Sequence, residues 1–435
     1  MKNLLTPLCR FLAVCSLTIA ALSCSNDDET PAAEITILSP TSGPKLTPVT
    51  IAGSNFGTTL ANVTVTFNDK PAEVTEVTNA KITALVPDKA GTGKVVVKIG
   101  ETTLGTQPVF VYELSVSTLA GSGAPGHVDG AGAIAKFDAP SGLTADANGN
   151  VFVTDFLNCS IRKITAEGVV SSLAGKLPGG YVDAQGELAQ FGYPNGVAVD
   201  AQGNLFISDE ATHTIRKVTP AGDVTTFAGK GWEPGDLNGT GSAARFKNPS
   251  GIAIDNQGNL YVADQLNNLI RKITALGVVT TLAGSGEPSF ADGTGAAAKF
   301  YRPVGVVVDG AGVVYVGDLF NHRIRKITPA GVVSTVAGTG IAGFVDGTKD
   351  EARFRYPAGL ALGADGTLYV ADTENRCIRK IDANGQVSTL AGRSEGFLDG
   401  PLSVALFRVP REIDIDATGT LYVADAGDNR IRKID

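Results

Sequence analysis

The sequence contains few of the residues that build disulfide frameworks and metal centres. Three of its five cysteines lie within the first 24 residues, which leaves Cys159 and Cys377 in the folded part. Two cysteines this far apart do not make a disulfide framework, so the fold must be stabilised by packing. The chain has one Met, one Trp and three His residues. A zinc site or a Cys–His pair therefore has no visible support, and we expect no catalytic residues, no metal and no cofactor.

Positive charge and long apolar runs are scarce as well. Lys and Arg number 36 against 44 Asp and Glu, which gives a formal net charge of −8. An acidic chain of this kind is not expected to bind nucleic acid. The one extended apolar run near the N-terminus, Phe11–Leu22, is too short to span a bilayer. It follows Lys2 and Arg10, and a short apolar run after basic residues is typical of an export signal.

The apolar run ends in Ala21-Leu22-Ser23-Cys24. This motif resembles the lipobox of bacterial lipoproteins, with Ala21 where a lipobox usually has Leu. The resemblance implies that residues 1–24 form the signal segment and that Cys24 carries the lipid. The acids at 27–29 resemble the surface-export signal of some Gram-negative lipoproteins, and the alternative is a soluble acidic spacer. We expect a tether over residues 25–33 and a protein anchored by lipid to the outer membrane, facing the cell exterior.

Glycine, in contrast, is abundant. It contributes 53 of the 435 residues, above the usual share of about 7%, and this indicates many turns between short strands. Over residues 34–113, seven segments of mostly alternating polarity are separated by turn residues, a pattern that predicts a β-sandwich. The expected strands are Ile35–Leu38, Val49–Ala52, Val63–Phe67, Ala72–Val77, Lys81–Val86, Lys94–Ile99 and Val109–Tyr112.

The segment 34–113 has neither Cys nor Trp, so the core of antibody-type domains is absent. It resembles the IPT/TIG family of Ig-like domains. The resemblance rests on the motifs at 37–44 (ILSPTSGP), 49–57 (VTIAGSNFG) and 63–67 (VTVTF). It implies an Ig-like sandwich that acts as a spacer.

From residue 114 onward the sequence is a repeat. The motif Ile-Arg-Lys occurs six times at intervals of 53 to 55 residues, and an Asp precedes each copy by six residues. A Phe, followed three residues later by a Pro, recurs with the same period. Each unit holds four strand-like segments separated by short turns, as in residues 251–283. Four strands in a repeat of this length predict the blades of a β-propeller.

The order of the strands predicts how the propeller closes. The last unit stops at Asp435 without a fourth strand, while Ser115–Ala120 looks like a fourth strand that precedes the first unit. If this N-terminal segment completes the last blade, residues 114–435 form six blades with no exposed sheet edge. The fold class is therefore all-β: an Ig-like β-sandwich followed by a six-bladed β-propeller closed by its N-terminal strand.

The units resemble NHL repeats, most clearly at 315–324 (YVGDLFNHRI). The resemblance covers residues 114–435 and implies propeller geometry but no single activity, because NHL propellers include binding platforms, sensors and a few enzymes. Residues present in every blade lie around a ring, so we interpret the six Asp, Arg, Phe and Pro positions as structural. The same applies to an outer set of aromatic residues on the links and His127: Tyr181, Phe290, Phe344 and Phe397.

Function is expected where the repeat is broken. The residues next to each recurrent proline enter the innermost strands, at the mouth of the central channel, and they differ between blades. Aromatic faces stack on sugar rings, and guanidinium groups bind carboxylate or hydroxyl-rich ligands; packing of the links is the competing interpretation. The candidate ligand-binding residues are Tyr193, Tyr301, Arg302, Arg355, Tyr356, Arg408, Arg411 and Glu412.

The leading hypothesis is a non-enzymatic surface lipoprotein whose propeller mouth binds an extracellular ligand. Carbohydrate is the favoured class, in support of an outer-membrane importer. Two alternatives stay open: a polysaccharide lyase or hydrolase that uses the same mouth, and a scaffold that docks other envelope proteins.

Overall fold

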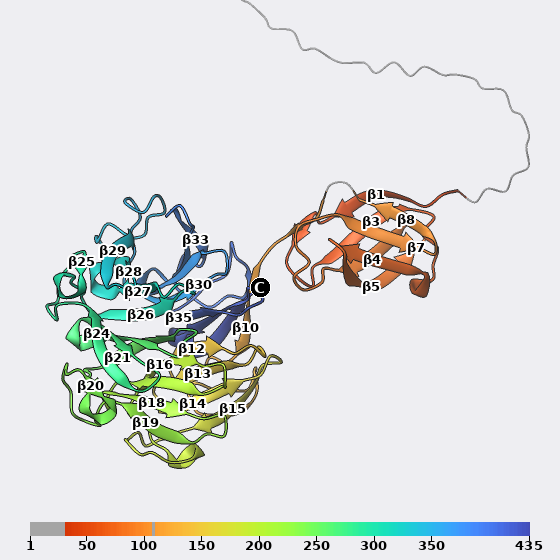
Figure 1. Ribbon diagram of the computed structural model, residues 1–435. Helices are drawn as coiled ribbons and strands as arrows, with labels where there is room; N and C mark the ends of the chain where they lie inside the picture. Colours follow the sequence, from red (N-terminus) through yellow and green to blue (C-terminus); the bar gives the residue numbers. More distant parts are fainter. Residues whose placement is uncertain (1–30, 107–108) are drawn as a thin grey trace, which may run out of the picture.

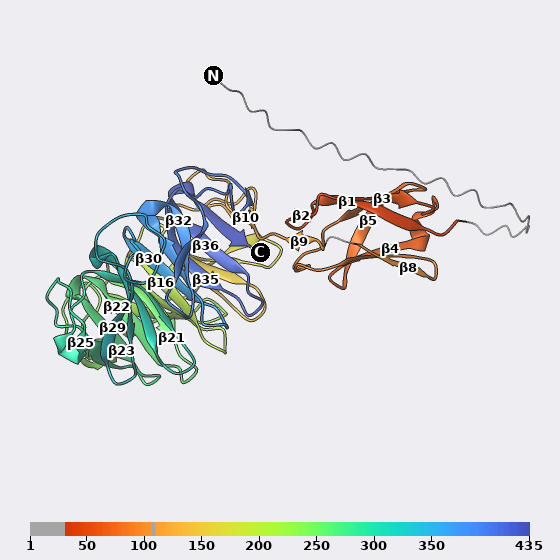
Figure 2. The ribbon, with the colours of Figure 1, turned by 90° about the horizontal axis from the view of Figure 1, so that it is seen from above.

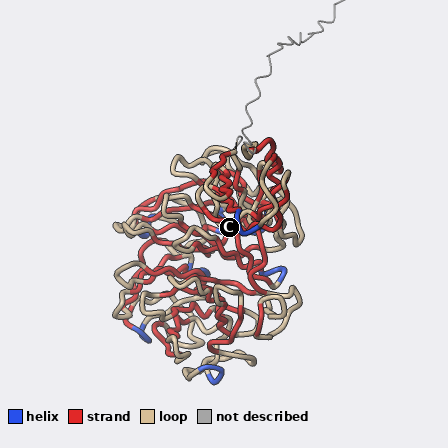
Figure 3. Tube along the Cα trace, turned by 90° about the vertical axis from the view of Figure 1, so that its right-hand side faces the viewer, coloured by secondary structure: helices blue, strands red, loops and turns tan. Residues whose placement is uncertain are grey.

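The computed structural model describes residues 31–106 and 109–435, which form two β domains joined by a short connection (Figure 1). The helical segments of this described part are three-residue 3-10 turns, and strands dominate the trace (Figure 3). None of these helical segments is long and apolar enough to cross a membrane. The signal segment expected at residues 1–24, with Cys24, lies outside the described residues.

The N-terminal domain is one seven-stranded sheet folded over on itself. Its strands pair in the order β1-β3-β6-β5-β4-β7-β8. Their bounds are β1 (Glu34–Ser39), β3 (Pro48–Ser54), β4 (Val63–Phe67), β5 (Lys70–Thr78), β6 (Lys81–Leu85), β7 (Val95–Ile99) and β8 (Thr102–Gly105). Strand β5 pairs with β6 along one part and with β4 along another, so it links the two layers.

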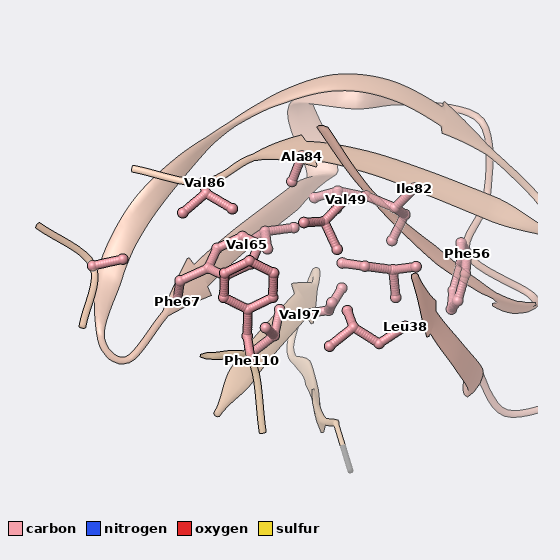
Figure 4. Packing of buried hydrophobic residues seen from close by; sticks show 14 residues of the cluster. Leu38, Val49, Phe56, Val65, Phe67, Ile82, Ala84, Val86, Val97 and Phe110 are labelled. Carbon is pink, nitrogen blue, oxygen red and sulfur yellow. The ribbon is translucent and has the colours of Figure 1, made fainter. Parts of the chain in front are cut away.

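The alternating pattern places one face of each layer in a shared core. Val49, Ile51, Val65 and Phe67 are fully or almost fully buried, and Phe67 meets Phe110 edge to face at 5.1 Å between ring centroids (Figure 4). The sequence pattern missed β8, whose four residues TTLG are largely exposed and carry little alternation. It also missed the parallel pair of β2 (Ser42–Gly43) with β9 (Val111–Tyr112).

The C-terminal domain is the six-bladed propeller. Each blade is numbered from its innermost strand outward. The first three are β12 (Pro140–Ala145), β13 (Val151–Asp155), β14 (Ser160–Ile164) and β15 (Val169–Ala174); β16 (Pro194–Val199), β17 (Leu205–Asp209), β18 (Thr214–Val218) and β19 (Val224–Ala228); and β21 (Pro249–Ile254), β22 (Leu260–Asp264), β23 (Leu269–Ile273) and β24 (Val278–Ala283).

The remaining blades follow the same order. They are β26 (Pro303–Val308), β27 (Val314–Asp318), β28 (Arg323–Ile327) and β29 (Val332–Ala337); β30 (Pro357–Leu362), β31 (Leu368–Asp372), β32 (Cys377–Ile381) and β33 (Val387–Ala391); and β35 (Pro410–Ile415), β36 (Leu421–Asp425) and β37 (Arg430–Ile434), completed by β10 (Ser115–Ala120).

The closure expected from the sequence is confirmed. Strand β10 pairs antiparallel with β37, with Val116 opposite Ile434 and Ser117 opposite Lys433. Ser115 and Asp435 exchange two backbone hydrogen bonds of 2.9 and 3.1 Å. The sixth blade is therefore built from both ends of the domain, and the outer edge of β37 is covered.

Four blades carry a further strand that the sequence did not reveal. Two-residue segments of the long links pair with the fourth strand and cover the sheet edge. These segments are β11 (Gly130–Ala131), β20 (Gly239–Thr240), β25 (Gly293–Thr294) and β34 (Gly400–Pro401). At two residues each, they are too short to produce a periodic pattern.

Hydrophobic clusters hold adjacent blades together. One cluster joins Phe137 and Val153 of the first blade to Tyr422 and Ile431 of the sixth. The recurrent phenylalanines are fully buried in this inter-blade layer: Phe137, Phe191, Phe246, Phe300, Phe354 and Phe407. They anchor the long links, as their periodicity predicts.

The sandwich contacts the sixth blade through two lysines. Lys45 pairs with the Asp435 carboxylate at 2.6 Å, and Lys89 donates to the hydroxyls of Thr418 and Thr420. In Figure 2 the connection between β9 and β10 joins the two domains near the C-terminus of the chain. The blade that closes the ring is thus also the blade that receives the N-terminal domain.

Candidate ligand-binding mouth of the propeller

The recurrent Asp and Arg residues form buried ion pairs inside each blade. Arg162 contacts Asp155 at 2.7 Å and Asp129, on the link, at 2.5 Å. The same arrangement recurs in every blade, with Asn238 in place of the link aspartate in the third. All six arginines and their strand aspartates are buried. Each of these arginines is paired with carboxylate or amide oxygens of its own blade. We therefore assign the pairs to the stability of the fold and not to ligand binding.

Burial changes the proton affinity of the strand aspartates. It raises the pKa of Asp155, Asp264 and Asp372 to about 6, against the opposing effect of their arginine and N–H partners. The outer aromatic set covers the same arginines: Tyr181 lies 5.0 Å from the Arg216 guanidinium, and Phe344 lies 5.1 Å from that of Arg379. The packing role expected for this set agrees with these contacts.

A cavity of about 380 Å³ opens at the mouth of the central channel. Its wall consists of residues that follow the recurrent prolines, residues that follow five of the strand aspartates, and Tyr356, which precedes its proline. They are Ser141, Phe156, Asn195, Glu210, Ser250, Gln265, Val304, Leu319, Phe320, Tyr356, Ala358, Thr373, Glu374, Arg411 and Glu412. The volume lies within the range of small-molecule sites.

Three of the eight predicted residues line this cavity: Tyr356, Arg411 and Glu412. Tyr193, Tyr301 and Arg302 contact its aromatic wall from outside. Arg355 and Arg408 are exposed on the rim and do not line the cavity. The sequence therefore predicts the region, while the wall also contains residues that the sequence reasoning missed.

Two aromatic groups stand on opposite sides of the mouth. On the side of the first two blades, the Phe156 ring stacks on Tyr193 at 5.0 Å and 18°. On the other side, Phe320 lies 5.0 Å from Tyr301 and 5.1 Å from Tyr356. Phe156 and Phe320 each lie two or fewer residues after a strand aspartate, a position that could have been compared between blades in the sequence.

Arginines reinforce both aromatic groups. The Arg411 guanidinium lies 6.0 Å from the Phe156 ring centroid, and that of Arg302 lies 5.2 Å from Phe320. Among the described residues, neither arginine has a carboxylate within 4.0 Å. Their N–H groups remain available to solvent or to a ligand.

The conformation of the residue before each recurrent proline depends on a side chain of the preceding blade. In four blades the residue before the proline has a left-handed conformation: Ala139, Asn248, Arg302 and Tyr356. Each of these residues donates its N–H to the side chain of an Asn or His in the preceding blade: Asn429, His213, Asn268 and His322. These bonds offset the cost of the left-handed backbone and fix the mouth residues.

The other two blades lack this acceptor. The equivalent positions are Cys159 and Arg376, and the pre-proline residues Tyr193 and Val409 instead donate to their own strand aspartates. Those aspartates then lie 3.4 Å from their arginines, against 2.7 to 2.9 Å in the other blades. An Asn or His at this position therefore binds the pre-proline N–H of the next blade, and without it that N–H binds the strand aspartate of its own blade.

The inner strand of the sixth blade differs from all others. Its third position is Glu412, where the other blades have Gly142, Gly196, Gly251, Gly305 and Gly359. A Cβ at the first four glycines would clash with a carbonyl oxygen of the next blade. Glu412 Oε1 accepts the Leu360 N–H at 3.2 Å, and Asp414 Oδ2 accepts the Ala145 N–H at 2.9 Å. The two carboxyls thus connect this strand to both of its neighbours.

Glu412 and Asp414 face the channel, where a second cavity of about 150 Å³ continues below the mouth. Burial raises the pKa of Glu412 to about 8, with the nearby Asp414 carboxylate adding to the effect. Burial likewise raises the pKa of Asp414 to about 6. Glu412 lines both cavities and so stands at their junction.

The cysteines and histidines serve the fold. Burial raises the pKa of the Cys159 thiol to about 11 and also raises that of Cys377. Both thiols are therefore poor nucleophiles. Within residues 31–106 and 109–435, no three His, Cys, Asp or Glu side chains gather as a metal site.

Comparison with known proteins agrees with both domains. Residues 33–112 match the IPT/TIG domain, and residues 191–218, 246–273 and 354–381 match the NHL repeat. The chain is 34% identical over 282 residues to the chloroplastic protein SUPPRESSOR OF QUENCHING 1 of Arabidopsis thaliana, covering 60% of this chain and 27% of that protein. It is 31% identical over 324 residues to human NHL repeat-containing protein 2, covering 64% and 44%. The chain thus spans less than half the length of these relatives.

Solved bacterial structures share the two-domain architecture. A structural genomics protein of unknown function from Bacteroides thetaiotaomicron has a TM-score of 0.60 at 25% identity, over 94% of this chain and 98% of that chain. A Bacteroides ovatus protein described as an auxiliary nutrient binding protein has a TM-score of 0.64 at 21% identity, over 93% and 98%. The chain therefore carries an IPT/TIG domain followed by NHL repeats that form a six-bladed propeller.

Proposed function

We propose that this protein is a lipid-anchored lipoprotein of the outer-membrane surface that binds an extracellular carbohydrate without catalysis, in support of nutrient uptake. The observation that carries the proposal is the mouth cavity, which lies where the blades differ. It combines aromatic rings on two sides with carboxylate, amide and guanidinium groups. Flat apolar faces beside hydrogen-bonding groups are the chemistry that a sugar ring requires.

The setting supports an uptake role. The lipobox-like motif at Cys24 and the sandwich that precedes the propeller fit a binding domain held away from a membrane. Two Bacteroides proteins that share the fold over nearly their whole length are described as auxiliary nutrient binding proteins. An outer-membrane importer and other envelope proteins are the partners that this role implies.

Binding of the purified protein to a glycan array and to polysaccharide affinity gels tests the proposal. The double substitution Phe156→Ala and Tyr356→Ala removes one ring from each side of the mouth. We expect it to weaken binding at least tenfold, because each stacking contact of the ligand with an aromatic ring contributes about 1 kcal/mol. Leu276→Ala is the control, since Leu276 is 86% exposed in a turn far from the mouth cavity. Equal binding by the double variant and the parent would reject the mouth as the site.

A further inference from the structure

The mouth cavity contains acidic side chains that have no basic partner. Glu210, Glu374 and Glu412 line it. In the described part of the chain, none of the three has a Lys, Arg or His nitrogen within 4.0 Å. This differs from the recurrent strand aspartates, each of which has an arginine partner.

Glu210 is held in one orientation by two amide groups. Its Oε2 accepts from Asn195 Nδ2 at 2.9 Å, and its Oε1 accepts from Asn248 Nδ2 at 3.0 Å. Both amides are neutral, so they position the Glu210 side chain without supplying a counter-charge. Glu412 stands deeper, where only its Oε1 is bonded to backbone N–H groups of the described residues.

The cavity also holds an unsatisfied hydroxyl. Ser250 lines the same wall and is fully buried, and its Oγ has no hydrogen-bond partner among the described residues. A buried polar group without a partner is costly. The carboxylates and this hydroxyl therefore lie together in one aromatic-walled space.

The exposure of the charges decides which of them requires a partner. Arg411 is the one cation of the cavity wall, and it is exposed, so water solvates its guanidinium. Glu210 is partly buried, where a lone carboxylate loses hydration without gaining a counter-charge, whereas Glu412, whose pKa burial raises to about 8, is an uncharged carboxyl near neutral pH. A cationic group of the ligand would restore that lost stabilisation, whereas an anionic group would add to the deficit.

We infer that the mouth binds a sugar that carries a protonated amine, with Glu210 receiving the ammonium group between the Phe156 and Phe320 sides. The inference rests on the proposed carbohydrate-binding function and specifies its ligand class. Arg355 and Arg408, on the rim of the mouth, would then face the neutral hydroxyls or the anionic substituents of the same sugar chain.

Isothermal titration near neutral pH with three soluble tetrasaccharides tests the ligand class. The probes are the β-linked glucosamine tetramer, its N-acetylated form and cellotetraose. They share one backbone and differ at a single position of each ring. We expect the glucosamine tetramer to bind about tenfold more tightly than the other two, as a charge-assisted hydrogen bond implies.

Variants assign the preference to the cavity. Glu210→Gln removes the charge and should lower the ratio of the glucosamine-tetramer affinity to the cellotetraose affinity to about one. Arg411→Ala removes the neighbouring cation and should strengthen binding of the glucosamine tetramer. Glu167→Gln is the matched control, because Glu167 is an exposed carboxylate in a turn of the first blade.

The outcomes separate this inference from the proposed function. Equal binding of all three tetrasaccharides would overturn the amine preference and leave carbohydrate binding intact. Tighter binding of an oligouronate than of the glucosamine tetramer would overturn it in favour of the arginines. Absence of binding by every carbohydrate, on the array and in solution, would overturn both.

Discussion

At the scale of single residues, the mouth depends on contacts between neighbouring blades. His322 ends the turn after β27, and its Nδ1 accepts the Tyr356 N–H at 3.3 Å. The His322 and Tyr356 rings also meet edge to face at 4.9 Å. Tyr356 has a φ of 54°, which a bulky residue adopts only when its surroundings hold it. The side chain of one blade therefore fixes a wall residue of the next.

The first prediction concerns this contact. Substitution His322→Ala removes the acceptor, so Tyr356 should leave the left-handed conformation and glycan affinity should fall about three- to tenfold. Stability should fall by about 1 kcal/mol, the value of one such hydrogen bond. His322→Asn is the control, because Asn268 and Asn429 accept the N–H of the pre-proline residue in other blades. Titration calorimetry and thermal unfolding measure both effects.

The contact also responds to pH. Burial lowers the pKa of His322 below its ordinary value of 6.5, with Arg355 adding to the effect. A histidine with a lowered folded pKa contributes stability that is present above 6.5 and is lost as the pH falls through the folded value, because the protonated Nδ1 cannot accept the bond. Loss of affinity in acid that persists in His322→Asn would contradict this account.

At the scale of the strand, β35 differs from the other inner strands because it buries two ionisable carboxyl groups, which destabilises the fold when they lose their protons. Glu412 has a folded pKa of about 8 and Asp414 of about 6, both raised by burial. Groups with raised folded pKa values contribute stability that is complete below their unfolded values and is lost as the pH rises through the folded values. The propeller should therefore lose stability between about pH 4 and 8.

Glu412→Gln tests this cost. Glutamine keeps the oxygen that accepts the Leu360 N–H but does not ionise, so the variant should show a flatter stability profile between about pH 4.5 and 8. Asp414→Asn is the matched control and should flatten only the lower part, between about pH 4 and 6. Urea unfolding across this range gives the profiles. A profile for Glu412→Gln that runs parallel to that of the parent would show that Glu412 does not titrate in this interval.

The element scale also shows what the sequence can predict. The repeat predicts the blades, their strand order and the closing strand, because the same Asp, Arg and Phe are buried in the same way in every blade. It does not predict β8 or the two-residue edge strands, which have no apolar period. The cavity wall is predicted in part, since Tyr356, Arg411 and Glu412 break the repeat visibly. Phe156 and Phe320 follow the aspartate that recurs in every blade, and their role emerges only when the ring brings two blades together.

At the scale of the whole molecule, the sixth blade combines three roles. It is completed by β10, it receives Lys45 and Lys89 of the sandwich, and it supplies Arg411 and Glu412 to the mouth. Both β10 and the sandwich contact precede the first full blade in the chain. The integrity of the ligand cavity is therefore linked to residues more than 290 positions away, as in the pairing of Val116 with Ile434.

Two truncations separate the closing strand from the sandwich. A chain that begins at residue 114 keeps β10 and loses only the sandwich with its two lysine contacts, so the propeller should melt within a few degrees of the parent.

A chain that begins at residue 122 also loses β10 and the burial of Val116 and Ala120. Burial of one valine contributes about 1.5–3 kcal/mol, and the lost strand also leaves the ladder of β37 unpaired. We expect the shorter chain to melt at least 10 °C lower, since 1 kcal/mol shifts the melting temperature of a large domain by about 2–4 °C. Its exposed edge should also cause self-association on size exclusion. Equal melting temperatures and monomeric behaviour in both truncations would mean that the ring does not depend on β10 for its closure.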